Sequence, residues 1–179
     1  DELREILRKV EKVVEDIERT SDKLRREVDK VVDDSRRKLE ELEKEVKKVI
    51  EDIRDGNLRE EEVREEVKRV VRKAEKLLED SRRETEKVVR DAEESNKEVK
   101  RLIDEVKKEL DRIIEEKDKV DRLKEAVKEL AKRLKDVHER NKRLIDTLRE
   151  KLKRINDELE RSVRELKKEL EEVIDRVRK

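Results

Sequence analysis

The sequence predicts an all-α fold, and more narrowly an elongated, antiparallel up-down-up three-helix bundle with nearly straight, coiled-coil-like helices. Three observations carry this prediction. Charged residues make up 61% of the chain and hydrophobic residues 31%, with no proline and no aromatic residue, a composition typical of long helices. Apolar residues recur at alternating steps of three and four, which places them on one helical face. This apolar stripe breaks its register twice, and each break predicts a turn.

The apolar stripe repeats every 18 residues. One series is Val10, Val28 and Val46, and later series begin at Val70 and Leu130. Eighteen residues in five turns give the 3.6 residues per turn of a straight α-helix, whereas a strict heptad would impose a left-handed supercoil. We therefore expect nearly untwisted helices. The single domain expected over residues 1–179 contains three helices, at about 1–54, 58–116 and 119–179.

The first turn is predicted at residues 55–57, within the stretch RDGNLREEE. Gly56 is the expected C′ residue of the first helix, because glycine tolerates the positive φ of that position. Asn57 is the expected N-cap of the second helix. Glu60 follows three residues later, which completes a capping box.

The second turn is predicted at about residues 116–120 and contains no glycine. Its position follows from the register break and from the stretch EEKDKVD. Asp118 is the expected N-cap of the third helix. Asp121 falls in the first turn of that helix, where an acidic side chain complements the helix dipole.

Composition and charge exclude several classes of partner. The 55 basic residues balance 55 acidic ones, so no net positive charge attracts nucleic acid or an anionic membrane. No aromatic ring is present to stack on bases. No apolar run approaches the ~20 residues of a membrane span. We therefore expect a monomer that requires no partner and binds neither nucleic acid nor membrane.

Polar residues interrupt the apolar stripe, and the two turns set them opposite one another. The first turn places Ser21 opposite Ser95, and the second places Asn96 opposite Asn141. Two buried polar layers follow from this register, and the sequence leaves open whether His138 joins the first and Thr85 the second. The first layer contains Thr20, Ser21, Ser95, Asn96, Asn141 and potentially His138. The second contains Ser35, Ser81, Asn156 and potentially Thr85.

The polar layers have a structural explanation. A uniformly aliphatic stripe permits slipped or reversed helix alignments. A displaced Asn or Ser would be buried without a hydrogen-bond partner, at ~1–3 kcal/mol each, so the layers penalise every alignment except one. The sequence therefore predicts that they specify helix register and topology.

The 18-residue register, the Glu/Lys/Arg surfaces, the absence of proline and aromatics, and the polar layers together resemble de novo designed parametric helical bundles with buried hydrogen-bond networks. The resemblance covers the whole chain, with RDGNLREEE as an idealised loop and DSRRKLEELEKEVKKVIEDI as surface sequence. The glycine-free second turn departs from the usual pattern. The resemblance implies a soluble structural scaffold without natural biochemical activity.

No catalytic, cofactor-binding or metal site is expected. His138 is the only side chain that ordinarily titrates near neutral pH. A zinc site normally combines several His or Cys ligands, and the chain contains no second His and no Cys. We expect a structural role for His138, either in the first polar layer or packed at the edge of the stripe, and we expect no enzyme.

A second function class stays open. The chain could instead be an interaction module that captures a partner helix or associates with itself. Spectrin-type repeats and cytoskeletal coiled coils are natural examples, although they normally carry aromatic residues, which are missing here. The mass of the protein in solution distinguishes a monomeric scaffold from a self-associating module.

Overall fold

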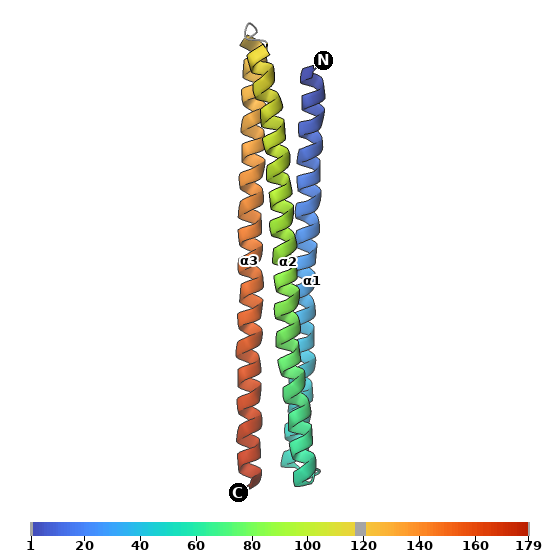
Figure 1. Cartoon of the computed structure of the whole chain (residues 1–179). Helices are drawn as coiled ribbons and strands as arrows, with labels where there is room; N and C mark the ends of the chain where they lie inside the picture. Colours follow the sequence, from blue (N-terminus) through green and yellow to red (C-terminus); the bar gives the residue numbers. More distant parts are fainter. Residues whose placement is uncertain (1, 117–120, 179) are drawn as a thin grey trace. The chain divides into compact units, whose positions relative to one another are not determined.

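The computed structural model describes residues 2–116 and 121–178, and this part of the chain folds into three α-helices (Figure 1). They are α1 (Glu2–Arg54), α2 (Glu60–Glu116) and α3 (Asp121–Arg178). The predicted all-α three-helix bundle is confirmed. The second predicted turn, with its expected N-cap Asp118, lies outside the described residues beyond the last residue of α2.

The chain forms two compact units, and each unit contains segments of all three helices. Unit 1 consists of residues 1–27 and 88–149, and unit 2 of residues 28–87 and 150–179. The expectation of one domain over residues 1–179 stays a prediction.

In unit 2, contacts across the helices define their directions. Ser35 of α1 contacts Ser81 of α2. Further along α1, Glu45 binds Lys73, which precedes Ser81 in α2. Residue numbers therefore rise in α1 as they fall in α2, so these two segments are antiparallel.

The α3 segment of unit 2 runs parallel to α1. Asp29 pairs with Lys151, and Arg36, further along α1, pairs with Glu158, further along α3. The residue numbers rise together in the two helices. The up-down-up order within unit 2 follows from these pairs.

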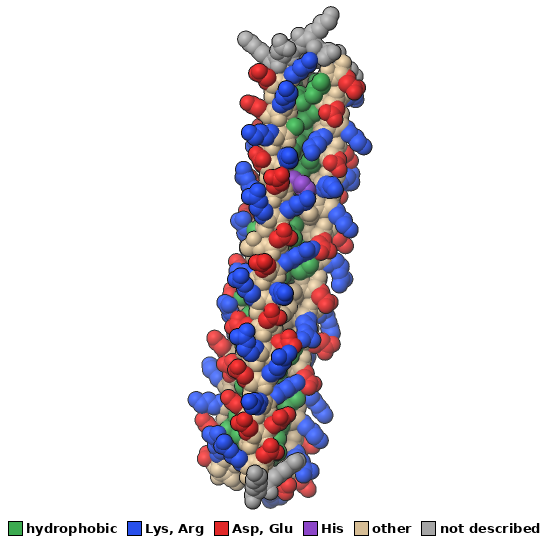
Figure 2. Space-filling model, turned by 90° about the vertical axis from the view of Figure 1, so that its left-hand side faces the viewer, with side chains coloured by type: hydrophobic (Ala, Val, Ile, Leu, Met, Phe, Trp, Pro, Cys, Tyr) green, Lys and Arg blue, Asp and Glu red, His purple; other side chains and the backbone are tan. Residues whose placement is uncertain are grey.

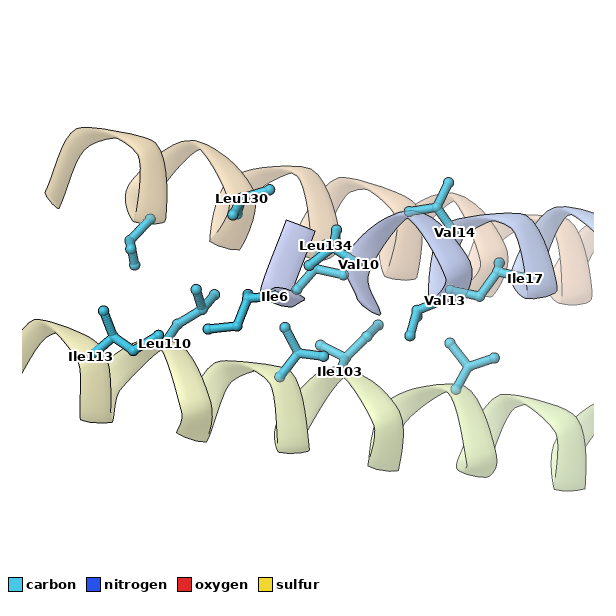
Figure 3. Packing of buried hydrophobic residues seen from close by; sticks show 13 residues of the cluster. Ile6, Val10, Val13, Val14, Ile17, Ile103, Leu110, Ile113, Leu130 and Leu134 are labelled. Carbon is cyan, nitrogen blue, oxygen red and sulfur yellow. The ribbon is translucent and has the colours of Figure 1, made fainter. Parts of the chain in front are cut away.

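An aliphatic core fills the centre of unit 1. Leu110, Ile113 and Leu134 are at most 2% exposed, and Val10 is completely buried. Figure 3 shows side chains of α1, including Ile6 and Val10, directed toward residues of α2 and α3. Each fully buried aliphatic side chain contributes about 1.5–3 kcal/mol relative to exposure, so this cluster is a main source of the unit's stability.

The residues of the predicted 18-residue series are mostly buried. Val10, Val28 and Val46 are at most 1% exposed. Leu148 is buried, but Leu166, the next member of its series, is only half-buried. The burial pattern follows the predicted stripe, while the untwisted geometry stays a prediction.

The first turn closes α1 through a Schellman motif. Gly56 has a φ of +72°, and its N–H donates to the carbonyl of Ile53 at 3.2 Å. The N–H of Asn57 donates to the carbonyl of Asp52 at 3.0 Å. These are the two hydrogen bonds of the motif, and they satisfy carbonyls that the end of a helix would otherwise leave free.

The predicted N-cap role of Asn57 is corrected by this geometry. The backbone N–H of Asn57 serves the end of α1, and α2 begins at Glu60 rather than at residue 58. Arg59 lies immediately before α2. Its carbonyl accepts the N–H of Val63 at 2.9 Å. Glu60 lies in the first turn, where its charge complements the helix dipole. Because Asn57 is not the N-cap of α2, Glu60 does not complete a capping box with it.

Candidate functional site: two polar clusters

Unit 1 contains a polar cluster of Ser21, Asn96 and Asn141, which we call the Asn141 cluster. The Ser21 hydroxyl donates to Asn141 Oδ1 at 3.1 Å, and Asn141 Nδ2 donates to Asn96 Oδ1 at 3.1 Å. Asn141 is 8% exposed, and its two partners are half-buried. A single carboxamide from α3 therefore links α1 and α2.

Unit 2 contains a second cluster of Ser35, Ser81 and Asn156, which we call the Ser81 cluster. The Ser81 hydroxyl donates to Asn156 Oδ1 at 2.8 Å, and its oxygen lies 3.5 Å from the Ser35 hydroxyl. Because a hydroxyl has one proton, Ser35 must be the donor to Ser81 in this arrangement. Ser81, from α2, therefore links α1 and α3.

The two clusters differ in their exposure. Ser35 and Ser81 are 4% and 3% exposed. In unit 1, Ser21 and Asn141 line two grooves, one of about 480 Å³ beside α2 and one of about 300 Å³ beside α3. The Asn141 cluster therefore borders space that solvent can enter.

Thr20 and Ser95 do not join the Asn141 cluster, although both were expected in the first layer. Thr20 is exposed, and its hydroxyl donates to the carbonyl of Asp16 in its own helix at 2.8 Å. Ser95 lines the larger groove and forms no hydrogen bond to another described residue. The expected pairing of Ser21 with Ser95 is replaced by the bond from Ser21 to Asn141.

His138 and Thr85, whose membership the sequence left open, also stay outside the hydrogen-bonded clusters. Among the described residues, neither His138 Nδ1 nor Thr85 Oγ1 has a partner, and both atoms are buried. A buried hydroxyl without a partner costs about 1–3 kcal/mol. Thr85 therefore places a hydroxyl without a partner among the described residues inside unit 2.

The environment of His138 disfavours its protonated form. Partial burial lowers the pKa of His138 below its ordinary value. The positive charges of Lys142, Lys100 and Lys107 lower it further, whereas Asp104 opposes the shift. Figure 2 shows the single histidine reaching the surface of the face in view.

The clusters lack the groups needed for acid–base or metal chemistry. Ser81 donates to a carboxamide oxygen, which is too weak a base to activate a hydroxyl nucleophile. Within residues 2–116 and 121–178, no group of three or more His, Cys, Asp or Glu side chains is placed to hold a metal ion. The arrangement can position helices, and it offers no activated nucleophile.

The sequence interpretation missed the ion pairs between helices. Lys9 of α1 binds Glu109 of α2 through both carboxylate oxygens, at 2.9 and 3.1 Å. Lys73 of α2 binds Glu45 of α1 in the same way, at 2.8 and 3.0 Å. Figure 2 shows acidic and basic side chains interspersed between narrow strips of hydrophobic ones. The same register that aligned the polar layers, applied to charges beside the stripe, would have indicated these pairs.

Comparison with known proteins places the fold. No protein-family model and no curated protein matches the chain. A solved structure described as a computationally designed three helix bundle matches it with a TM-score of 0.61 and 17% sequence identity, covering 98% of this chain and 86% of the other. The chain therefore shares its fold with a designed three-helix bundle. None of the helices in the described ranges carries an apolar stretch long enough to cross a bilayer.

Proposed function

We propose that this protein is a designed structural scaffold without enzymatic or other natural biochemical activity, whose polar clusters specify the register of its helices. The observation that carries the proposal is the same in both units: one polar side chain binds partners from the other two helices. The chemistry of the clusters supports a structural role, because carboxamides and hydroxyls form directional hydrogen bonds but do not activate one another.

The clusters favour one helix register because a shifted register would break their hydrogen bonds. If α3 moved by one turn relative to α1 and α2, Asn141 would lose both Ser21 and Asn96. Each polar group left buried without a partner would cost about 1–3 kcal/mol. An aliphatic side chain pays no such penalty, since one Leu or Val replaces another with small loss.

The fold similarity supports a designed origin, as does the sequence. A designed three-helix bundle shares the fold over 98% of this chain. The complete absence of proline and aromatic residues, with 55 basic against 55 acidic residues, agrees with idealised helices built from strong helix formers.

The test removes the whole Asn141 cluster at once, by combining Ser21→Val, Asn96→Leu and Asn141→Leu. No orphaned partner remains, so we expect the free energy of unfolding to hold or rise. We also expect several sets of amide NMR signals in place of one, because an aliphatic stripe accepts several alignments.

The matched control combines Thr20→Val with Thr147→Val. Both hydroxyls bond only to the backbone of their own helix, so the control should keep a single set of signals. A triple variant with one sharp set of signals would overturn the role of the cluster.

The alternative function is a module that captures a partner helix or associates with itself. Sedimentation equilibrium over a hundredfold range of concentration separates the scaffold from a self-associating module, because only the module gains mass. Capture of a partner helix is measured separately, by binding of a labelled peptide.

A further inference from the structure

One groove of unit 2 combines an apolar floor with a charged rim. It lies between α1 and α3 and has a volume of about 530 Å³. Ile50, Leu166 and Val173 form its apolar part, and Ser162 leaves space at one end because its side chain is small. Leu166 is half-buried, so an apolar surface is left for another side chain to cover.

The rim of this groove is acidic. Three basic residues line it, Lys47, Arg54 and Arg176. They are outnumbered by five glutamates, which are Glu43, Glu51, Glu165, Glu169 and Glu172.

The charges of the rim have no ion-pair partner among the described residues. Elsewhere in unit 2, α1 and α3 exchange ion pairs, as Asp29 does with Lys151 and Arg36 with Glu158. Within the described part of the chain, none of the eight charged residues of the groove forms an ion pair, although opposite charges line both sides. The excess of carboxylates is therefore free to interact with a positively charged partner.

We propose that this groove docks an amphipathic helix of another polypeptide, with aliphatic residues on the face that enters the groove and Lys or Arg along both flanks. The lining residues of α3 extend from Ser162 to Arg176, a length of about 21 Å at 1.5 Å per residue. That length fits about four turns of a docked helix, whose apolar residues at i, i+3, i+4 and i+7 would meet Leu166 and its neighbours.

The charge of the rim selects this occupant over a second copy of the chain. Each groove carries five glutamates and three basic residues. Two copies meeting groove to groove would therefore bring together two surfaces that each have an excess of two negative charges, and like charges across an interface are destabilising. The Lys or Arg residues on both flanks of a basic helix would instead be attracted to the glutamates that α1 and α3 contribute to the rim. This inference adds capture of a partner helix to the scaffold role. The polar clusters and the groove involve different residues, so a failure of peptide binding would leave the role of the polar clusters standing.

The test uses the intact protein and a synthetic 18-residue amidated peptide with Leu and Ala on one face and Lys on both flanks, labelled with fluorescein. Fluorescence anisotropy should show saturable binding of one peptide per protein. A peptide with Glu in place of every Lys should bind at least tenfold more weakly. Equal binding of the two peptides, or no binding of the Lys peptide, would overturn the proposal.

Two variants locate the binding. The triple variant Glu165→Lys, Glu169→Lys and Glu172→Lys should weaken binding by about tenfold or more. Leu166→Ser changes no charge and should weaken it by about threefold to tenfold, because it removes the exposed apolar contact. Circular dichroism at each concentration verifies that both variants keep their helices.

The matched control is the triple variant Glu11→Lys, Glu15→Lys and Glu18→Lys in unit 1. These glutamates have the same spacing, are exposed and receive the same change of charge. Binding to the control should stay within about twofold of the parent protein. An equal loss in both triple variants would show general charge attraction and overturn the assigned groove. So would a dimer that forms without peptide and disappears with the Glu165/Glu169/Glu172 variant, because it would assign the groove to a second copy.

Discussion

The Asn141 cluster and the Ser81 cluster each link three helices through hydrogen bonds, but they use different side chains. In unit 2, two short serines meet one asparagine, and the serines are at most 4% exposed. In unit 1, two asparagines meet one serine, and grooves of about 480 and 300 Å³ border Ser21 and Asn141. The comparison indicates that a cluster built on short hydroxyls packs closely, whereas a carboxamide bridge leaves space beside it.

This difference has an energetic consequence. In the Ser81 cluster, Ser35 and Ser81 are almost fully buried and only Asn156 is half-buried, so water reaches an unpaired serine hydroxyl there less readily. An unpaired group in the Asn141 cluster can bind water from either groove, and a water-mediated bond recovers much of a direct one. The same kind of lesion should therefore cost more in unit 2 than in unit 1.

The largest effect is expected from Ser81→Ala. The variant removes the donor to Asn156 and the acceptor for Ser35 together. The buried Ser35 and the half-buried Asn156 each lose a partner, and we expect the free energy of unfolding to fall by about 1–3 kcal/mol. Urea titration followed by circular dichroism measures the change. A loss below about 0.5 kcal/mol, the lower limit for an ordinary hydrogen bond, would show that the cluster contributes little to stability.

Asn141→Leu should cost less than Ser81→Ala, although it also removes a central residue. Ser21 and Asn96 lose their partner, but water in the adjoining grooves can replace it. We expect a loss of about 1 kcal/mol, the size of one ordinary hydrogen bond, in the same urea titration. If Asn141→Leu proved more damaging than Ser81→Ala, exposure to the grooves would not be what separates the clusters.

The sequence predicted the three-helix fold correctly, because the spacing of apolar residues follows the helical repeat. The observed α2 begins at Glu60, two residues after the predicted start. The sequence could not show that the backbone N–H of Asn57 would donate to a carbonyl at the end of α1. Gly56 signals a left-handed turn, but the number of residues between that turn and the next helix depends on how the chain reverses direction.

The polar residues show a second limit of prediction from sequence. Register placed Ser21 near both Ser95 and Asn141, but it could not show which of them Ser21 would bind. That choice depends on reach, because a carboxamide extends further from its helix than a hydroxymethyl group. Thr20 and Ser21 are neighbours near the edge of one stripe, and periodicity alone did not show that only Ser21 turns inward.

Thr85→Val removes an unpaired hydroxyl, whereas the two preceding substitutions create unpaired groups. The Thr85 hydroxyl lies in unit 2 and is buried without a partner among the described residues. Valine has nearly the same shape and carries no hydroxyl to desolvate, so the free energy of unfolding should rise by about 0.5–1 kcal/mol. Thermal unfolding measures the gain, and Thr147→Val, whose hydroxyl bonds to its own helix, is the control. A loss of stability in Thr85→Val would show that the hydroxyl does bind a partner such as water.

The smallest effect is expected from His138 in unit 1, and it should appear only in the pH dependence. Partial burial, assisted by Lys142, Lys100 and Lys107, lowers the folded-state pKa of His138, and Asp104 only partly offsets this. The unfolded chain, with a pKa near ~6.5, therefore takes up the proton first as pH falls. The stability that neutral His138 contributes is complete above about pH 6.5 and is lost as pH falls toward the lower folded-state pKa.

The comparison is with His138→Leu between pH 7.5 and 5.5, a range that lies above most carboxylate titrations. The free energy of unfolding of the parent protein should fall more steeply than that of the variant, and an NMR titration of the imidazole should give a pKa below ~6.5. Because His138 is half-exposed, solvent screens the effect, and it should be smaller than those of the three preceding substitutions. Parallel pH curves for the two proteins would show that His138 titrates alike in the folded and unfolded states, so that neither its burial nor the nearby lysines bear on stability.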